Sequence, residues 1–146
     1  MRFGWIFGAV AGGLALCIAL LLLAVFLTRD EDNLQADNLL AERFTLAVAR
    51  SSREGTPLEL REIAPFEWDR VLLVADGTSR EEISRRLGRE WTGIDTVDGG
   101  DLLIFLQGGE VVRFADYRGL GRFEGFPRPF AELPPVLNVD SLVITA

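Results

Sequence analysis

The feature that most constrains this chain is a run of 26 consecutive uncharged residues between Arg2 and Arg29. Leu, Ala, Ile, Val, Phe and Gly make up most of it. An α-helix rises about 1.5 Å per residue, so residues 5–27 would span about 34 Å. That length crosses the roughly 30 Å hydrocarbon core of a bilayer, and a helix bonds its own backbone polar groups there. The sequence therefore predicts an N-terminal transmembrane anchor over residues 1–28.

Two processing alternatives remain open beside an uncleaved anchor. A cleaved signal peptide has a shorter apolar core of about 7–15 residues and a small-residue cleavage site, which "AVFLTRD" does not offer. Lipoprotein processing at Cys17 is suggested by "LALC", but Leu16 is bulky for the preceding position and ten further apolar residues follow. The length of the apolar run favours the uncleaved anchor.

The charges beside the run give a nearly balanced count, with Arg2 on one side and Arg29 on the other. Because the N-terminal tail is short and the C-terminal part long, we expect the tail inside and the domain outside, at the cell envelope. Glycines at four-residue spacing, Gly4, Gly8 and Gly12, form a ridge that would let two such helices pack closely. The ridge predicts a homodimer through the membrane helix, although glycine is also common in membrane helices.

Beyond the anchor, residues 28–146 hold fourteen of the fifteen basic residues and all twenty-two acidic residues, a formal charge of −8. This balance disfavours nucleic acid and anionic lipid headgroups, which need clustered positive charge. Every basic residue is arginine, the chain has no histidine, and Cys17 is its one cysteine. The familiar histidine- and thiol-dependent catalytic sets are therefore excluded. We expect a domain that is not an enzyme and binds no cofactor.

Patterning predicts an α+β domain at residues 43–146 behind a charged stem at residues 29–42, with a mainly antiparallel sheet and one short inserted helix. Residues 43–63 fit either a strand pair or a helix, and the alternation of Phe44, Leu46 and Val48 favours strands. The apolar run from Arg70 to Ala75 predicts a strand. "LLIFLQ", Gly108-Gly109 and "EVVRFADY" predict a hairpin of residues 101–107 and 110–117. The Gly- and Pro-rich residues 118–135 predict no regular element, and "VDSLVITA" predicts one last strand.

A turn at Asp76-Gly77-Thr78 precedes "SREEISRRLG". Asp76-Gly77-Thr78 resembles the end of the D-x-D-G-T phosphoryl-transfer loop of the haloacid-dehalogenase type. In that loop the nucleophile is an aspartate two positions earlier, and this chain has Val74 at that position. A structural explanation accounts for more residues: Ser79 and Glu82 form a capping box, two i,i+4 Glu–Arg pairs follow, and Gly88 ends the helix.

Two further groups of side chains are candidate sites. Asp95, Asp98 and Asp101 surround two glycines and are weak candidates for calcium, although their spacing does not match a calcium loop. With Asp76 they would form the rival function, a carboxylate-based hydrolase or calcium-dependent module. Around "FPRPF", the arginines are candidates for partner binding, unless the neighbouring phenylalanines simply enter the core. These arginines are Arg118, Arg122 and Arg128.

A resemblance covers about 50 residues from Ala64, through "APFEWDRVLLV", "TSREEISRRLGREW" and "DLLIFLQGGEVVRF". The segment resembles a family of small, uncharacterised bacterial proteins with a membrane helix or lipoprotein signal and a P-F-x-W-D motif. The residues that match are Pro65, Phe66, Trp68, Asp69, Ile83, Leu87, Gly88 and Trp91. The family continues its first strand into an aromatic-Gly-Pro-Tyr stretch, where this chain has Val74 to Gly77. The resemblance implies an envelope location and a similar fold, and it implies no activity.

Overall fold

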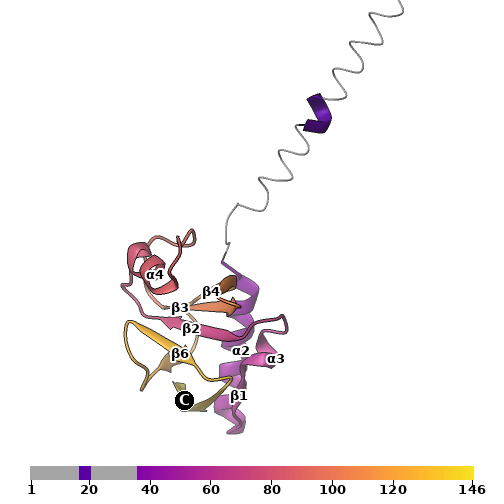
Figure 1. Cartoon of the computed structure of the whole chain (residues 1–146). Coiled ribbons are helices and arrows are strands. Elements are labelled where there is room, and N and C mark those ends of the chain that lie inside the picture. The colour runs from indigo at the N-terminus through magenta and orange to yellow at the C-terminus, as the bar shows by residue number, and fades with distance from the viewer. Residues whose placement is uncertain (1–16, 21–35) are drawn as a thin grey trace, which may run out of the picture. The chain divides into compact units, whose positions relative to one another are not determined.

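The computed structural model describes residues 17–20, which are helical, and residues 36–146, which form a folded domain (Figure 1). Among these residues, no helix has both the length and the apolar character needed to cross a bilayer. Most of the predicted anchor, including Gly4, Gly8 and Gly12, lies outside the described residues.

The domain is α+β with mainly antiparallel sheets, as the sequence predicts. Its helices are α2 (Asn38–Glu54), α3 (Leu60–Ile63) and α4 (Arg80–Leu87). Its strands are β1 (Leu58–Glu59), β2 (Arg70–Val74), β3 (Asp101–Gln107), β4 (Glu110–Tyr117), β5 (Arg122–Phe123), β6 (Phe130–Leu133), β7 (Val136–Asp140) and β8 (Val143–Thr145). The single predicted helix is therefore one of three in residues 36–146.

The central sheet has the strand order β4-β3-β2-β6, and every neighbouring pair in it is antiparallel. The predicted strand β2 and the predicted β3–β4 hairpin are confirmed. Gly108 and Gly109 form the hairpin turn with φ of 58° and 85°, angles that glycine adopts without a steric penalty. In this sheet β2 lies between β3 and β6 (Figure 1).

Both faces of the central sheet are buried, which explains why β2 and β3 are apolar without alternation. Successive side chains of a strand point to opposite faces. Val71 and Leu73 pack with Phe44 and Val48 of α2 in one cluster. Leu72 and Val74 pack with Ile83 of α4 in another. Helices α2 and α4 therefore cover opposite faces of the sheet.

Residues 43–63 do not form the favoured strand pair. Asp37 caps α2 by accepting a hydrogen bond from the Leu40 backbone N–H (2.9 Å), and the helix ends at Gly55 in a left-handed conformation. Phe44 is fully buried, whereas Leu46 is 60% exposed. The alternation of apolar residues was misleading, because the buried face is the helical series through Leu40, Phe44 and Val48. The helix also begins inside the predicted stem at residues 29–42.

The C-terminal third contains more regular structure than its Gly and Pro content predicts. Strand β6 pairs with β2 at the edge of the central sheet, so the prediction of no regular element at residues 118–135 is wrong. The predicted last strand is two strands, β7 and β8, separated by a turn in which Ser141 and Leu142 have positive φ. These strands form a second sheet of order β1-β7-β8-β5, in which β5 and β8 are parallel.

Tyr117 provides a test of the packing between α2 and the sheets. Its ring lies 4.8 Å from that of Phe44 and 6.0 Å from that of Phe123, measured between centroids, and its hydroxyl donates to the Leu120 carbonyl. Burial raises the pKa of Tyr117 to about 12, against a smaller lowering by a hydrogen bond with Thr45.

We therefore expect stability to fall as the pH rises from about 10 to about 12, because the unfolded chain loses the phenol proton before the folded chain does. Tyr117 is the single tyrosine and the chain has no lysine, so the absorbance of tyrosinate reports this group directly. The Tyr117→Phe variant should lack this part of the pH dependence. Ionisation near pH 10 in the folded chain would contradict the burial.

Candidate functional site

The turn at Asp76 is a structural element that leads from β2 into α4 and is hydrogen-bonded to the loop before β3. The Thr78 hydroxyl donates to the Ala75 carbonyl (2.7 Å), and Gly77 has a φ of 83°. The Asp76 carboxylate accepts a hydrogen bond from the Gly99 backbone N–H (3.0 Å). Asp76 therefore holds the loop of residues 95–100 against the end of the sheet.

The predicted capping box at the start of α4 is confirmed. The Ser79 hydroxyl accepts from the Glu82 backbone N–H (3.4 Å), and the Glu82 carboxylate accepts from the Ser79 backbone N–H (2.9 Å). These hydrogen bonds from the Ser79 backbone and side chain lower the pKa of Glu82, with a smaller contribution from the charge of Arg85. The predicted stop is also confirmed, because Gly88 ends the helix with a φ of 69°. The cap fixes the direction in which α4 leaves the sheet.

The capping box gives a prediction for acid stability. Ionised Glu82 should stabilise the folded chain above its ordinary pKa of 4.5, and this contribution should be lost as the pH falls below 4.5 through the lowered folded-state pKa. We expect Glu82→Gln to reduce the loss of stability on acidification, measured by urea unfolding across the acidic range. Glu81→Gln is the matched control, since it removes a neighbouring charge without touching the cap. Identical acid profiles for the chain and Glu82→Gln would contradict the prediction.

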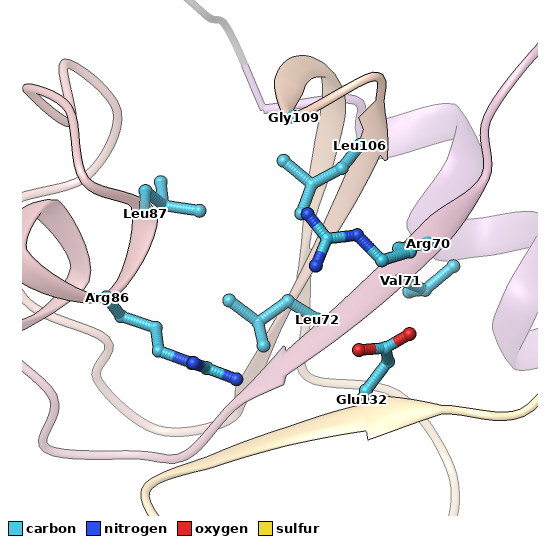
Figure 2. Close-up of a pocket in the computed structure, with 8 residues that line it drawn as sticks. All are labelled: Arg70, Val71, Leu72, Arg86, Leu87, Leu106, Gly109 and Glu132. Atoms are coloured by element: carbon cyan, nitrogen blue, oxygen red, sulfur yellow. The ribbon is translucent and has the colours of Figure 1, made fainter.

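Beside the last turn of α4, a hollow of about 100 Å³ opens against the central sheet. Leu72 and Leu106 form its floor, and Leu87 forms a wall on the α4 side (Figure 2). Val71 and Gly109 complete the lining. Three charged side chains surround the opening: Arg70 from β2, Arg86 from α4 and Glu132 from β6. We call these eight residues the Arg70–Arg86 hollow.

The two guanidinium groups of the hollow are weakly engaged by the rest of the domain. Arg70 Nε lies 3.9 Å from Asp69 Oδ1, and both side chains are about half exposed. The other oxygen of Asp69 accepts the Gly108 backbone N–H (2.7 Å). Across residues 36–146, no carboxylate pairs with Arg86, and Glu132 pairs with neither arginine. The opening therefore has two available cations and one available carboxylate.

The chemistry available in the hollow is that of binding. A guanidinium stays protonated at any physiological pH and cannot act as a general base. It donates hydrogen bonds in a fork that fits planar anions. Glu132 is the one carboxylate among the lining residues, so a pair of carboxylates acting as acid and base is not present in the hollow. An apolar floor with charged groups at its opening is typical of a small binding site.

The carboxylates predicted from the sequence are divided between different contacts. Asp76 and Asp101 are neighbours, since Asp101 Oδ1 accepts from the Asp76 backbone N–H (3.4 Å) and from Arg128 (3.3 Å). Asp95 pairs with Arg80, and Asp98 is exposed. Within the part of the chain that the structure describes, no three acidic or sulfur ligands gather into a metal site. The structure therefore brings together two of the four aspartates, and both are already hydrogen-bonded.

The three arginines predicted to bind a partner each form an ion pair with a different carboxylate. Arg118 pairs with Asp116, Arg122 with Glu124, and Arg128 with Asp101. The neighbouring phenylalanines enter the two core clusters: Phe123 is buried, and Phe126 and Phe130 are partly buried. This arrangement matches the alternative in which the aromatic side chains serve the core.

Sequence reasoning did not identify the Arg70–Arg86 hollow, because its lining comes from four separate segments. The i,i+4 spacing predicts the pairs Glu81–Arg85 and Glu82–Arg86, yet neither pair is among the ion pairs of residues 36–146. Arg70 marked only the start of a strand. No local signal marked Arg86, because Glu82 four residues earlier is a carboxylate at the spacing of a helical ion pair.

The residues that carry the family resemblance serve mainly as core and turn residues. Trp68 and Trp91 are buried, and their indole N–H groups donate to the carbonyls of Ala64 (3.0 Å) and Ile94 (2.9 Å). A scan of protein-family models and searches of curated proteins and of solved structures each found no match to this chain. The resemblance to the P-F-x-W-D family therefore stays a prediction.

Proposed function

We propose that this chain is a single-pass membrane protein that presents a non-catalytic α+β binding domain at the cell envelope. The uncharged run before Arg29 supports the anchor, because its length and composition suit a bilayer. The resemblance to small membrane-anchored bacterial proteins agrees with this location. The observation that carries the binding role is the Arg70–Arg86 hollow, an apolar floor under two guanidinium groups without strong partners.

The anchor is tested by washing membranes with alkaline carbonate and following the full-length chain. We expect it in the pellet, and a variant with Leu14→Arg and Leu21→Arg should leave the membrane, because each arginine costs about 2.5–3.5 kcal/mol at the centre of a membrane helix. A matched variant with Leu14→Ile and Leu21→Ile should stay in the pellet. Full-length chain in the carbonate supernatant would refute the anchor.

The side of the membrane on which residues 36–146 lie is tested separately, by protease digestion of intact cells or of cells whose outer membrane has been made permeable. Digestion of residues 36–146 without lysis of the inner membrane is the expected result. Protection of these residues until lysis would place the domain in the cytosol and would refute the envelope location.

We also propose that two copies associate through the glycine ridge of the anchor, since small residues at four-residue spacing let membrane helices approach closely. Replacing Gly8 and Gly12 with Ile should abolish crosslinking between copies in the membrane. Ala9→Ile and Ala11→Ile form the control at positions between the glycines. Unchanged crosslinking of the glycine variant would refute association through this face.

A further inference from the structure

We propose that the Arg70–Arg86 hollow recognises a monoanionic carboxylate on a short aliphatic chain. In this arrangement the guanidinium groups of Arg70 and Arg86 hold the carboxylate, and Leu72 and Leu106 contact the chain. The inference deepens the binding role proposed above by naming the class of ligand, and it rests on that role.

The first observation that indicates an anionic ligand is that the guanidinium groups of Arg70 and Arg86 have no close carboxylate partner among residues 36–146. The chain has more acidic than basic residues, and several arginines of the domain have close carboxylate partners, as Arg89 has Glu110 and Arg113 has Asp37. In the hollow, Arg70 has only a 3.9 Å contact through Nε, which leaves its two terminal nitrogens to donate outward. Both head groups border the opening over Leu72 (Figure 2). An anion placed there would form charge-assisted hydrogen bonds with both.

The size and the lining of the hollow limit the group to which the carboxylate of the ligand is attached. Leu72 and Leu106 are each 5% exposed and present small aliphatic areas to the hollow, and the partly buried Leu87 adds to them without an aromatic ring. A volume of about 100 Å³ is well below the roughly 300–1,000 Å³ typical of sites for drug-sized ligands. The hollow therefore suits a few aliphatic carbons, as in a short branched acid or one aliphatic residue with a free carboxylate.

Glu132 affects which ligand charge the hollow binds most readily. Its position on β6 is opposite Leu72 in the register of the sheet, so its carboxylate shares the opening with the two guanidinium groups. The three charges together leave one net positive charge, which fits a ligand with one negative charge. A dianion such as phosphate would be repelled more strongly by Glu132, and a cation would be repelled by the two arginines. Because the two guanidinium groups also attract a dianion more strongly, Glu132 reduces the preference for phosphate, and the leucine side chains supply the preference for a carboxylate with a short aliphatic chain.

The test uses the full-length chain in micelles of a non-ionic detergent, with NMR of the arginine Nε–H groups. Three probes of one shape are titrated: 4-methylpentanoate, the neutral 4-methylpentanamide and the cation 3-methylbutylammonium. Inorganic phosphate is the fourth probe. We expect only 4-methylpentanoate to give saturable shifts at both Arg70 and Arg86. Equal binding of the amide, stronger binding of phosphate or of the ammonium ion, or no binding at all would overturn the proposed ligand class.

Four variants separate the contributions of the charged side chains around the opening to the affinity for the carboxylate. Arg70→Gln and Arg86→Gln should each weaken carboxylate binding by about tenfold or more, since a hydrogen bond to a charged group contributes about 1.5–3 kcal/mol. Glu132→Gln should strengthen it by about two- to fivefold, in line with the energies of exposed charge pairs. Arg85→Gln is the matched control, because it removes the same charge from α4 at a residue that does not line the hollow.

A loss of affinity in Arg85→Gln as large as that in Arg86→Gln would attribute binding to the general field of the helix and would overturn the site. Weaker binding in Glu132→Gln would mean that Glu132 contacts a positive group of the ligand, which would overturn a simple carboxylate. These outcomes do not depend on carbonate extraction. If no probe binds while the chain stays in the carbonate-washed membrane pellet, the ligand class alone is refuted. If the chain is found in the carbonate supernatant, the anchor alone is refuted.

Discussion

Replacing Phe44 with alanine should destabilise the domain by about 3–5 kcal/mol, the usual cost of deleting a buried aromatic side chain. Phe44 is fully buried, and its ring packs against those of Tyr117 and Phe123. It therefore joins α2 to both sheets. Because small domains are stable by about 5–15 kcal/mol, the variant should be unfolded to a large extent under mild denaturation.

Leu46→Ala is the matched control for Phe44→Ala, and it also tests the structure of residues 43–63. In a strand, Leu46 would share the buried face with Phe44 and Val48, and its loss would cost several kcal/mol. In the helix, Leu46 is exposed, so its replacement should change the unfolding free energy by less than about 0.5 kcal/mol. The measurement is urea unfolding of the full chain in non-ionic micelles, followed by hydrogen exchange of β2 and β3 amides. Equal losses in the two variants would refute the helix.

Trp91→Ala should cost a similar 3–5 kcal/mol on the other face of the central sheet. The indole is buried against Phe114, with ring centroids 4.9 Å apart, and its N–H donates to the Ile94 carbonyl. A Cβ at Gly93 would collide with this ring, so the loop closes directly over it. Removing the ring leaves a cavity between the loop and the sheet and an unpaired Ile94 carbonyl.

Trp91→Phe separates the two contributions of Trp91. It retains an aromatic ring against Phe114 and loses only the N–H donor and part of the volume, so we expect a loss between that of Trp91→Ala and zero. Leu120→Ala, at a half-exposed position, is the control for a change in apolar surface outside the core. Hydrogen exchange should show the loss of protection first at the amides of Val97, which donates to the Thr78 carbonyl, and Gly77, which donates to the Val97 carbonyl. No loss of protection there would contradict the proposed role of the ring.

The elements that the sequence predicted correctly are those whose signals are local. The capping box of Ser79 and Glu82, the stop at Gly88 and the two-glycine hairpin depend on residues within a few positions of one another. Strand β2 was predictable because it is a short apolar run between polar residues. These elements would look the same in many different tertiary folds, and this is why the sequence alone suffices for them.

The elements that were missed depend on distant partners. Strand β6 exists because its backbone pairs with β2, more than fifty residues earlier, in spite of the prolines around it. The ambiguity at Phe44, Leu46 and Val48 was resolved by a buried helical face that only the rest of the core defines. For the same reason the Arg70–Arg86 hollow was invisible in the sequence, since the register of three strands and the end of α4 bring its residues together.

The sequence by itself determined the uncharged run that predicts a membrane anchor, the lack of histidine, and the local capping and turn signals, because each depends on residue type or on near neighbours. The tertiary structure alone decided which apolar residues are core and which arginines form close ion pairs. Burial and ion pairing depend on which segments meet in space. Neither is a property of neighbours along the chain.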